Sequence, residues 1–454
     1  MNFRGLGWDG VSLVLLSVFF VYFLWHSLAV VLYPVWLDES EGYMLNSAVQ
    51  FLEGGILYSD VNLPGSLPNP YPPLFTVFSA FLMLLRGKGL LAGRLLSLFA
   101  SLFCGFLLFR IMRLLRVGFV RALVFSLLFY TSRFIFLWSP LFRVDMLALF
   151  FSLCGIYFVL WRGGGLVSSV FFFVLAFYTK QSFIAAPLAV FLYCLLHNRR
   201  LGLKFFLIFL FSCMAVFILI NQMTSGQFFL NIVSYNLNRF SWEVALLWLS
   251  FSLLLHLPLV LGSISGLVRG GVSVVSFYLI LSLLSSFSVG KYGAYFNYFI
   301  EPFAVMIVVS SLGFANKGFQ QVLLVVSCIL FFSVSASLDY VVDMSDARVT
   351  GFDNLAGVMR GVGGDVLSED PQLAISAGKK VAFHPQWFSE LESAGLWNSS
   401  GITRACRNHE FSLVVLLEGD SKFKRFPELL KCVHSVYNKT SLVDVSGVKY
   451  GVYQ

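Results

Sequence analysis

Residues 11–42, VSLVLLSVFFVYFLWHSLAVVLYPVWLDESEG, decide how the chain must fold. Residues 11–36 carry no Asp, Glu, Lys or Arg, and this run exceeds the roughly 20 residues that a helix needs to cross a bilayer. Three acids follow within four positions, at Asp38, Glu39 and Glu41. Because a carboxylate inside the bilayer is costly, the acids mark the point where a first membrane span ends and an aqueous loop begins.

Apolar blocks of this kind recur along most of the chain. Of its 454 residues, 58% are hydrophobic and 12% are charged, against roughly 25% charged residues in a soluble globular protein. The pattern predicts a mainly α-helical, polytopic membrane bundle over residues 1–337. About eleven spans are expected, at 11–36, 90–110, 117–132, 142–161, 165–179, 183–196, 205–221, 244–263, 271–288, 300–314 and 319–337.

The last part of the chain, residues 338–454, has a mixed and charged composition instead. Short apolar runs alternate there with helix-like stretches, which predicts a small α/β domain. Strands are expected at 365–368, 381–383, 412–417 and 448–453, and helices near 371–377, 386–394, 400–409 and 427–437.

The basic residues indicate how the chain sits in the membrane. Residues 74–85 are apolar but too short for a span, so an interfacial helix is expected there. With a cytosolic N-terminus, the cytosolic loops then hold 11 Lys and Arg residues and one acid, Asp9, as the positive-inside rule requires. The loop 37–89 and the domain 338–454 are therefore expected to be extracytosolic. The net charge of +8 reflects this orientation, and nucleic acid is not an expected partner.

The seven cysteines do not form a disulfide framework. Five of them lie in apolar blocks, where Cys behaves as a small hydrophobe. Cys406 and Cys432 both lie in the C-terminal domain and are able to pair if that domain is extracytosolic. The spacing of Cys and His matches no zinc site.

Polar residues gather at the extracytosolic ends of the expected spans. Taken alone, each of these residues is explained as well by an interfacial anchor or a local ion pair as by a functional role. The loop acids alone are explained by a solvated face of the loop. Together they place carboxylates and cations beside apolar walls. Sugar transfer from a polyprenyl phosphate needs this combination: a carboxylate base, cations for the departing phosphate, and a groove for the lipid. The residues are Asp38, Glu39, Glu41, Arg143, Asp145, Lys180, Lys291, Asn297, Tyr298 and Glu301.

In the order of its motifs the chain resembles the GT-C superfamily of membrane glycosyltransferases. Within it, the chain is similar to the branch of protein O-mannosyltransferases and aminoarabinose transferases. The matching motifs cover nearly all of residues 30–305. They are Asp38-Glu39, Gly55-Ile56-Leu57-Tyr58, Tyr71-Pro72-Pro73-Leu74, Ala92-Gly93-Arg94-Leu95-Leu96-Ser97, Arg143-Val144-Asp145, Lys180-Gln181-Ser182, and Gly293 with Asn297-Tyr298-Phe299 and Glu301.

The resemblance implies a role for each of these residues. Asp38 would be the general base of a single inverting displacement, with Glu39 as its orienting neighbour. The donor would be a polyprenyl- or dolichyl-phosphate sugar, and the acceptor a hydroxyl of a protein, glycan or lipid. Loop support would come from Glu41, Tyr58 and Tyr71, and contacts to the donor phosphate or sugar from Arg94, Arg143, Asp145, Lys180, Lys291, Asn297, Tyr298 and Glu301.

Two details of the loop bear on these implied roles. Some branches of the family use a divalent cation, and Asp38, Glu39 and Glu41 would supply oxygen ligands for Mg²⁺ or Mn²⁺. Aminoarabinose transferases place an Arg shortly after the Asp-Glu pair, whereas here Ser40, Glu41 and Gly42 follow. The phosphate contacts are therefore expected to differ.

Functions other than sugar transfer also occur among polytopic membrane proteins. A secondary transporter commonly has inverted repeats and polar residues near the bilayer midplane, whereas this sequence shows no repeat and has its polar residues at span ends. A lipid-linked glycan ligase or polymerase, and a non-catalytic scaffold, are also compatible with such a bundle. The sequence favours a glycosyltransferase of a prokaryotic plasma (inner) membrane, with its active site outside the cytosol.

Overall fold

The computed structural model describes residues 7–55, 57–63, 65–161, 165–313, 318–338, 344–419 and 421–454. Ile56 of the Gly55–Tyr58 motif lies outside these residues. Three of the basic residues counted for membrane orientation, Arg4, Arg162 and Lys317, also lie outside them.

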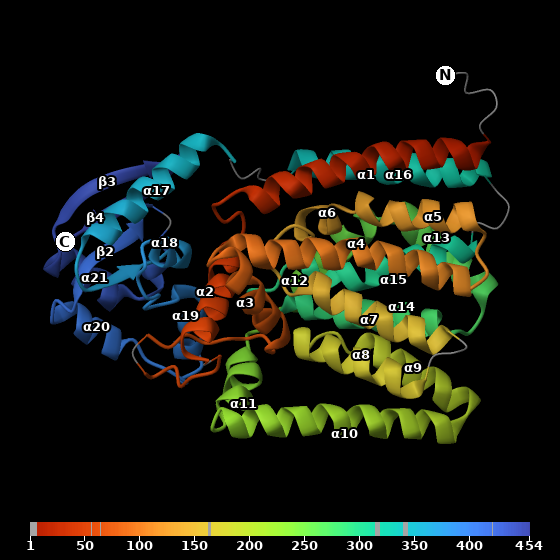
Figure 1. Cartoon of the computed structure of the whole chain (residues 1–454), viewed down its shortest axis with the longest axis horizontal. Helices are drawn as coiled ribbons and strands as arrows, with labels where there is room; N and C mark the ends of the chain where they lie inside the picture. Colours follow the sequence, from red (N-terminus) through yellow and green to blue (C-terminus); the bar gives the residue numbers. More distant parts are fainter. Residues whose placement is uncertain are drawn as a thin grey trace.

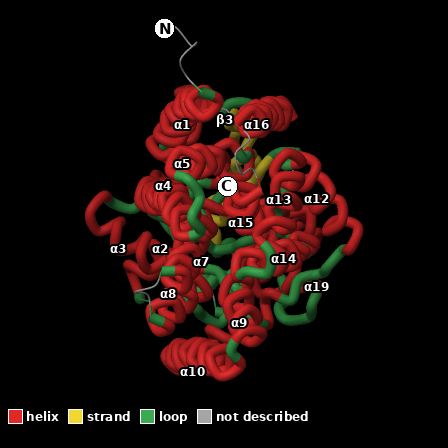
Figure 2. The backbone as a smooth tube through the Cα atoms, turned by 90° about the vertical axis from the view of Figure 1, so that its right-hand side faces the viewer, coloured by secondary structure: helices red, strands yellow, loops and turns green. Residues whose placement is uncertain are grey.

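Most of the chain is a bundle of helices that run roughly along the long axis of the molecule, with the C-terminal part at one end (Figure 1). Viewed end-on, α1 and α16 lie at one edge of the bundle and α10 at the opposite edge (Figure 2). The helices of this bundle are α1 (Trp8–Leu32), α4 (Leu90–Leu114), α5 (Phe119–Leu128), α6 (Arg133–Trp138), α7 (Asp145–Leu160), α8 (Leu166–Thr179), α9 (Ala185–His197), α10 (Arg199–Met223), α11 (Gln227–Ile232), α12 (Trp242–Leu255), α13 (Leu257–Gly270), α14 (Val274–Ser285), α15 (Ile300–Gly313) and α16 (Gly318–Leu338).

Several of these helices are suited to a membrane. Within the described residues, α1, α4, α10 and the segment Phe296–Gly313 are each long and apolar enough to cross one. The bent pair α12 and α13 adds a fifth if it counts as one span, and six further apolar helices are shorter. The predicted count of eleven spans therefore stays a prediction.

The prediction of one continuous helix over residues 244–263 was wrong. Two helices, α12 and α13, cover this segment and meet at an angle of 85°. Pro258 lies in the first turn of α13, where a ring without an N–H is tolerated and the preceding helix cannot continue through it. His256, between the two helices, accepts or donates a 2.9 Å hydrogen bond with Ser132. That contact ties the bend to the break between α5 and α6.

The loop after α1 contains two helices. α2 (Glu39–Gly54) begins with a capping box, in which the Asp38 side chain accepts from the backbone and Glu41 reaches back to the N-cap. It ends at Gly55, whose φ of 69° is the left-handed conformation that glycine adopts readily. α3 (Leu74–Arg86) covers the apolar stretch expected at the interface and leaves Phe81, Leu84 and Leu85 exposed.

The C-terminal part is an α/β unit, as expected. Its sheet has the order β1-β2-β4-β3, with β1 parallel to β2 and the other pairs antiparallel. Cys406 of α20 and Cys432 of α21 form a disulfide, which confirms the pairing considered from the sequence. The elements are α17 (Asp346–Gly361), β1 (Asp365–Ser368), α18 (Pro371–Ser376), α19 (Pro385–Ser393), α20 (Ser400–Arg407), β2 (Phe411–Leu417), α21 (Pro427–Val436), β3 (Lys439–Val445) and β4 (Val448–Tyr453).

One strand prediction for this unit was wrong, and one strand was missed. Residues 381–383 form no strand, and the sheet ends at β1 on that side. β3 was missed because it is an edge strand whose first four residues are exposed, so it lacks the apolar run that reveals a buried strand.

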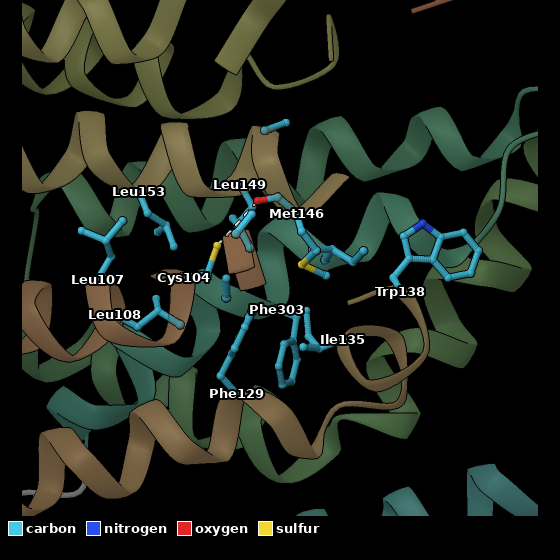
Figure 3. Packing of buried hydrophobic residues seen from close by; sticks show 14 of the residues in the cluster. Cys104, Leu107, Leu108, Phe129, Ile135, Trp138, Met146, Leu149, Leu153 and Phe303 are labelled. Carbon is cyan, nitrogen blue, oxygen red and sulfur yellow. Dashed lines mark hydrogen bonds between the residues drawn. The ribbon is translucent and has the colours of Figure 1, made fainter. Parts of the chain in front are cut away.

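The core of the bundle is packed from aromatic and aliphatic side chains of helices far apart in sequence. Figure 3 shows Cys104 of α4 beside Met146 of α7, with Phe129 and Phe303 close by. The Cys104 thiol donates to the Met146 carbonyl at 3.7 Å and is fully buried. Buried cysteine therefore acts here as a small packing residue, as expected.

Small residues let α13 and α15 approach closely. A Cβ at Gly266 would overlap the Val309 carbonyl, and one at Gly313 would lie 2.8 Å from the Gly262 carbonyl. Ser263 and Ser310 share a 3.0 Å hydrogen bond across the same contact. This is the small-residue packing typical of helix pairs in membranes.

We predict that Gly266→Ala destabilises the protein by about 1–3 kcal/mol, because the added methyl must displace a helix backbone. The measurement is the apparent melting temperature of the purified protein in detergent. Gly270→Ala on the same helix is the matched control, since its Cβ would only touch Leu312 at 3.4 Å. Equal melting temperatures for the two variants would contradict the close α13–α15 contact.

Candidate functional site

The start of α2 is held by a buried ion pair. Arg94 of α4 donates to both oxygens of Glu41, at 2.8 and 2.7 Å, and both side chains are fully buried. Arg94 also donates to the carbonyls of Val30, Tyr33 and Val35 at the end of α1. One guanidinium thus fixes the end of the first helix and the beginning of the second.

Further contacts keep Glu41 ionised. Burial raises the pKa of its carboxyl, but the Arg94 charge, its hydrogen bonds, and N–H donation from Leu37 and Phe142 together hold that pKa below its ordinary value. Phe142 precedes α7, so the same carboxylate also ties the loop to the segment that carries Arg143.

Asp38 lies at the N-cap of α2 with one carboxylate oxygen engaged. Its Oδ1 accepts from the Ser40 N–H at 3.1 Å and from Arg143 Nη1 at 3.2 Å. Its Oδ2 has no hydrogen-bond partner among the residues that the structure describes. The side chain is 31% exposed and lines a cavity. One oxygen orients the group while the other is able to take a proton.

Asp145, the first residue of α7, organises the cations behind Asp38. Its Oδ1 accepts from Lys180 Nζ at 2.6 Å and from Asn297 Nδ2 at 2.8 Å. Its Oδ2 accepts from the Trp138 indole at 3.0 Å and lies 3.9 Å from Arg143 Nε. Four groups from four segments are thus arranged around one buried carboxylate.

These groups line a cavity of about 820 Å³ between the helical bundle and the C-terminal unit. Asp38, Arg143, Lys180 and Asn297 lie on its polar side, together with Lys291. Its apolar side is formed by side chains of α8, α10 and α11 and of the residues after α11: Phe177, Phe217, Phe228, Ile232, Val233 and Leu237. α10 has most of its own surface exposed and lies at the edge of the bundle in both views (Figures 1 and 2). A ligand with a charged head and a hydrocarbon tail matches this lining.

The position of Lys291 is fixed by backbone pairing between its segment and residues 239–240. Lys291 forms a bridge with Phe240, and the Tyr292 N–H donates to the Arg239 carbonyl at 2.8 Å. Gly293 follows with a φ of 80°, which turns the chain into the segment of Asn297. The Lys291 ammonium is exposed and has no ion pair or side-chain hydrogen bond in the described ranges, unlike Lys180, which is paired and only 3% exposed.

The C-terminal unit is bonded directly to the residues before Asp38. The Trp36 indole donates to Asp370 Oδ2 at 2.7 Å, and the Trp36 N–H donates to Gln372 at 2.7 Å. Gln372 in turn donates to the Pro34 carbonyl at 2.7 Å. Lys422 forms an ion pair with Glu39. Two residues of α19, Gln386 and Trp387, complete the wall of the cavity.

The structure therefore brings most of the predicted site residues together. Asp38, Glu39, Tyr71, Arg143, Lys180, Lys291, Asn297 and Tyr298 line the cavity, and Asp145 lies directly behind it. The Tyr298 ring lies 4.3 Å from the Lys180 ammonium, and Arg143 Nη2 lies 3.5 Å from the Tyr71 hydroxyl. Tyr58 is buried and donates to the Tyr71 carbonyl at 2.8 Å, so it supports the loop from behind.

Two residues predicted to contact the donor are placed elsewhere. Arg94 does not line the cavity, because all of its donors face Glu41 and the α1 carbonyls. Glu301 is buried in α15, where it accepts from the Tyr278 hydroxyl at 2.9 Å, and it also lies away from the cavity. Both belong to the interior of the bundle.

The three loop acids do not assemble into a metal site. Glu41 is turned inward to Arg94, Asp38 faces Arg143, and Glu39 faces Lys422. No group of three or more His, Cys, Asp or Glu side chains suited to a metal ion occurs in the part of the chain that the structure describes. The arrangement therefore does not fit the divalent cation considered from the sequence.

Sequence reasoning missed several residues of the cavity. Trp138 bonds to Asp145, and Asn236 donates to the Pro70 carbonyl at 2.9 Å. Trp387 and Gln386 come from the far C-terminal unit. A Trp within an apolar run and an amide in an unassigned loop carry no distinguishing signal, so only the fold identifies them.

We predict that Arg94→Met destabilises the protein by about 3–5 kcal/mol, because it leaves the buried Glu41 carboxylate unpaired. The matched control is Lys88→Met, which breaks the half-exposed pair with Glu53 and should cost less than about 1 kcal/mol. The readout is again the apparent melting temperature in detergent. Because the folded pKa of Glu41 is lowered, the wild-type contribution is complete above the ordinary Glu pKa of about 4.3 and is lost as the pH falls through the lower folded value. A small effect of Arg94→Met at neutral pH would contradict this role.

Comparison with known proteins finds likeness in structure but not in sequence. No family model and no curated protein matches the chain. The crystal structure of ArnT from Cupriavidus metallidurans in the apo state is similar with a TM-score of 0.64 and 13% identity, over 96% of this chain and 98% of that one. The structure of the same protein bound to undecaprenyl phosphate gives 0.66 and 12% over the same shares. The fold implied by the sequence resemblance is thereby confirmed: the chain has the same fold as these two ArnT structures.

Proposed function

We propose that this protein transfers a sugar from a polyprenyl-phosphate donor to an acceptor hydroxyl, with inversion and with Asp38 as the general base. The observation that carries this proposal is the free Asp38 oxygen in a cavity that also holds three cations and an apolar wall. A base, an anion site and a lipid groove are the three requirements of such a transfer.

The apolar wall supports a lipid donor. Phe177, Phe217 and Phe228 line the side of the cavity next to α10, so a hydrocarbon chain entering there would leave its phosphate near the cations. The similar ArnT structure is described as bound to undecaprenyl phosphate. We extend that class of ligand to this chain, without fixing the sugar.

The reaction follows from the placement of the charges. The acceptor hydroxyl gives its proton to Asp38 Oδ2 as its oxygen bonds to the anomeric carbon. The bond from that carbon to the phosphate oxygen breaks, and the electron pair leaves with the polyprenyl phosphate. Lys291, Lys180 and Arg143 stabilise the negative charge that this phosphate gains. Asp145 touches two of these cations and so keeps them in position.

The expected orientation supports the use of a lipid donor. With a cytosolic N-terminus, the cavity and the C-terminal unit face the extracytosolic side of a prokaryotic inner membrane. A lipid-linked sugar is the form of activated sugar that a bilayer can present on that side, and the acceptor is a protein, glycan or lipid located there.

We predict that Asp38→Asn lowers the transfer rate by about 10²–10⁴-fold, because the amide keeps the contacts of Oδ1 but cannot accept a proton. Binding of the polyprenyl-phosphate sugar should persist. The assay follows labelled sugar from donor to acceptor with the full-length protein in lipid nanodiscs. Asp60→Asn, which changes a carboxylate of the same loop outside the cavity, should transfer at the wild-type rate. A folded Asp38→Asn variant with undiminished transfer would overturn the assignment of the base.

We predict that Lys291→Gln weakens donor binding by about tenfold, because an unpaired ammonium is replaced by a neutral group beside the phosphate. The loss should shrink as the salt concentration rises, since exposed charges are screened. Binding is measured by titrating a fluorescent polyprenyl phosphate. Lys449→Gln removes an exposed cation from β4, away from the cavity, and should leave the affinity unchanged. Equal affinities for the two variants would remove Lys291 from the phosphate site.

A further inference from the structure

A second, smaller chamber opens beside the donor cavity. It has a volume of about 90 Å³, well above the roughly 10–15 Å³ that a single water molecule needs. Glu39, Ser40, Tyr71 and Arg143 line both spaces, so the two meet next to Asp38. A molecule in the chamber would therefore lie beside the residues that flank the proposed base.

One wall of this chamber comes from a single helix of the C-terminal unit. His384 caps α19, and Gln386, Trp387 and Glu390 follow on the same helix. His384 is 2% exposed, and burial, followed by the nearby Lys422 charge, holds its pKa well below the ordinary value, so its ring is neutral. Its Nδ1 accepts from the Trp387 N–H at 3.3 Å, which assigns the proton to Nε2.

That buried Nε2 donor has no hydrogen-bond partner in the described chain. A buried polar group left unpaired costs free energy unless a ligand or water satisfies it. The Glu390 carboxylate also has no ion pair or hydrogen bond among the described residues. The Glu390 carboxylate is thus available to an occupant of the chamber, whereas His384 Nε2 is enclosed by protein atoms.

The chamber differs in charge from the donor cavity. Lys180 and Lys291 line the cavity and not the chamber. Among the described lining residues, Arg143 is the chamber's one cation, and it already contacts Asp38. The remaining polar lining consists of amides and hydroxyls: Ser40, Tyr43, Asn46, Ser47, Asn69, Asn238 and Tyr292.

Such a lining selects for a particular kind of acceptor. Amide, hydroxyl and carboxylate groups match the many donors and acceptors of a sugar ring, and the Trp387 ring offers an apolar face to its C–H bonds. A phosphorylated head group would instead bring a negative charge next to the unpaired Glu390 carboxylate, which like-charge repulsion disfavours.

Resting on the proposed function, we propose that this chamber binds an uncharged sugar ring of a glycan acceptor, and that α19 selects it. The ring's hydroxyl would reach Asp38 where the chamber and the cavity join. The C-terminal unit would then determine acceptor choice, while the helical bundle holds the donor.

The test compares two acceptors that differ only in charge. Full-length protein in nanodiscs, supplied with labelled polyprenyl-phosphate sugar, is offered a neutral oligosaccharide or the same oligosaccharide bearing a terminal phosphate. We expect kcat/KM to be at least tenfold higher for the neutral acceptor. Glu390→Gln should raise the KM for the neutral acceptor about tenfold. It should also reduce the ratio of kcat/KM between the neutral and the phosphorylated acceptor. The affinity for the donor should stay unchanged. Glu428→Gln, an exposed carboxylate on α21, is the matched control and should change none of these values.

The outcomes separate this inference from the function on which it rests. If the donor binds but the phosphorylated acceptor is used as well or better, or if Glu390→Gln leaves the KM of the neutral acceptor unchanged, the assignment of the chamber is wrong and the transfer reaction stands. If the protein binds the donor but uses neither acceptor, the assignment of the chamber as an acceptor site is also wrong. If the protein does not bind the polyprenyl-phosphate sugar at all, the proposed function fails and the inference falls with it.

Discussion

The buried pair between Arg94 and Glu41 is the interaction on which the site depends. A charge buried without a partner is strongly unfavourable, so neither side chain is stable in that position without the other. The pair joins the end of α1, the start of α2 and the segment before α7. Asp38 lies three residues from Glu41 and Arg143 one residue from Phe142, so the pair sets the distance between the proposed base and its neighbouring cation.

A second set of contacts holds the same segment from the opposite side. Trp36, Gln372 and Asp370 join the C-terminal unit to the residues before α2, and a Cβ at Gly42 would lie 2.7 Å from Pro371. Residues 34–42 are therefore packed between the bundle and the α/β unit. A movement of that unit relative to the bundle would displace the loop that carries Asp38, and would thereby couple the proposed acceptor binding near α19 to the geometry of the proposed base.

The sequence was sufficient to predict the helical bundle, the α/β unit and the carboxylate after the first helix, because long apolar runs and a clustered set of acids are local signals. The sequence analysis wrongly assigned Arg94 to the donor site, because a sequence motif does not show which side chain a residue contacts. The partner, Glu41, is 53 positions away, and burial of both side chains appears only in three dimensions. Trp387 reaches the cavity from the other end of the chain, and β3 lies at a polar sheet edge, so neither has a local signature.

The charges of the cavity explain why a phosphate would be drawn to one part of it. Asp38 and Asp145 balance Arg143 and Lys180, which leaves that group of four without net charge. Lys291 stands outside this balance, at the exposed end of the cavity. An arriving phosphate would first meet the unbalanced cation and then share the others, whose positions Asp145 already holds. Because those cations need not reorganise as charge develops on the leaving phosphate, their stabilisation acts mainly in the transition state. In the proposed reaction, Asp145 would therefore support catalysis by holding these cations in position.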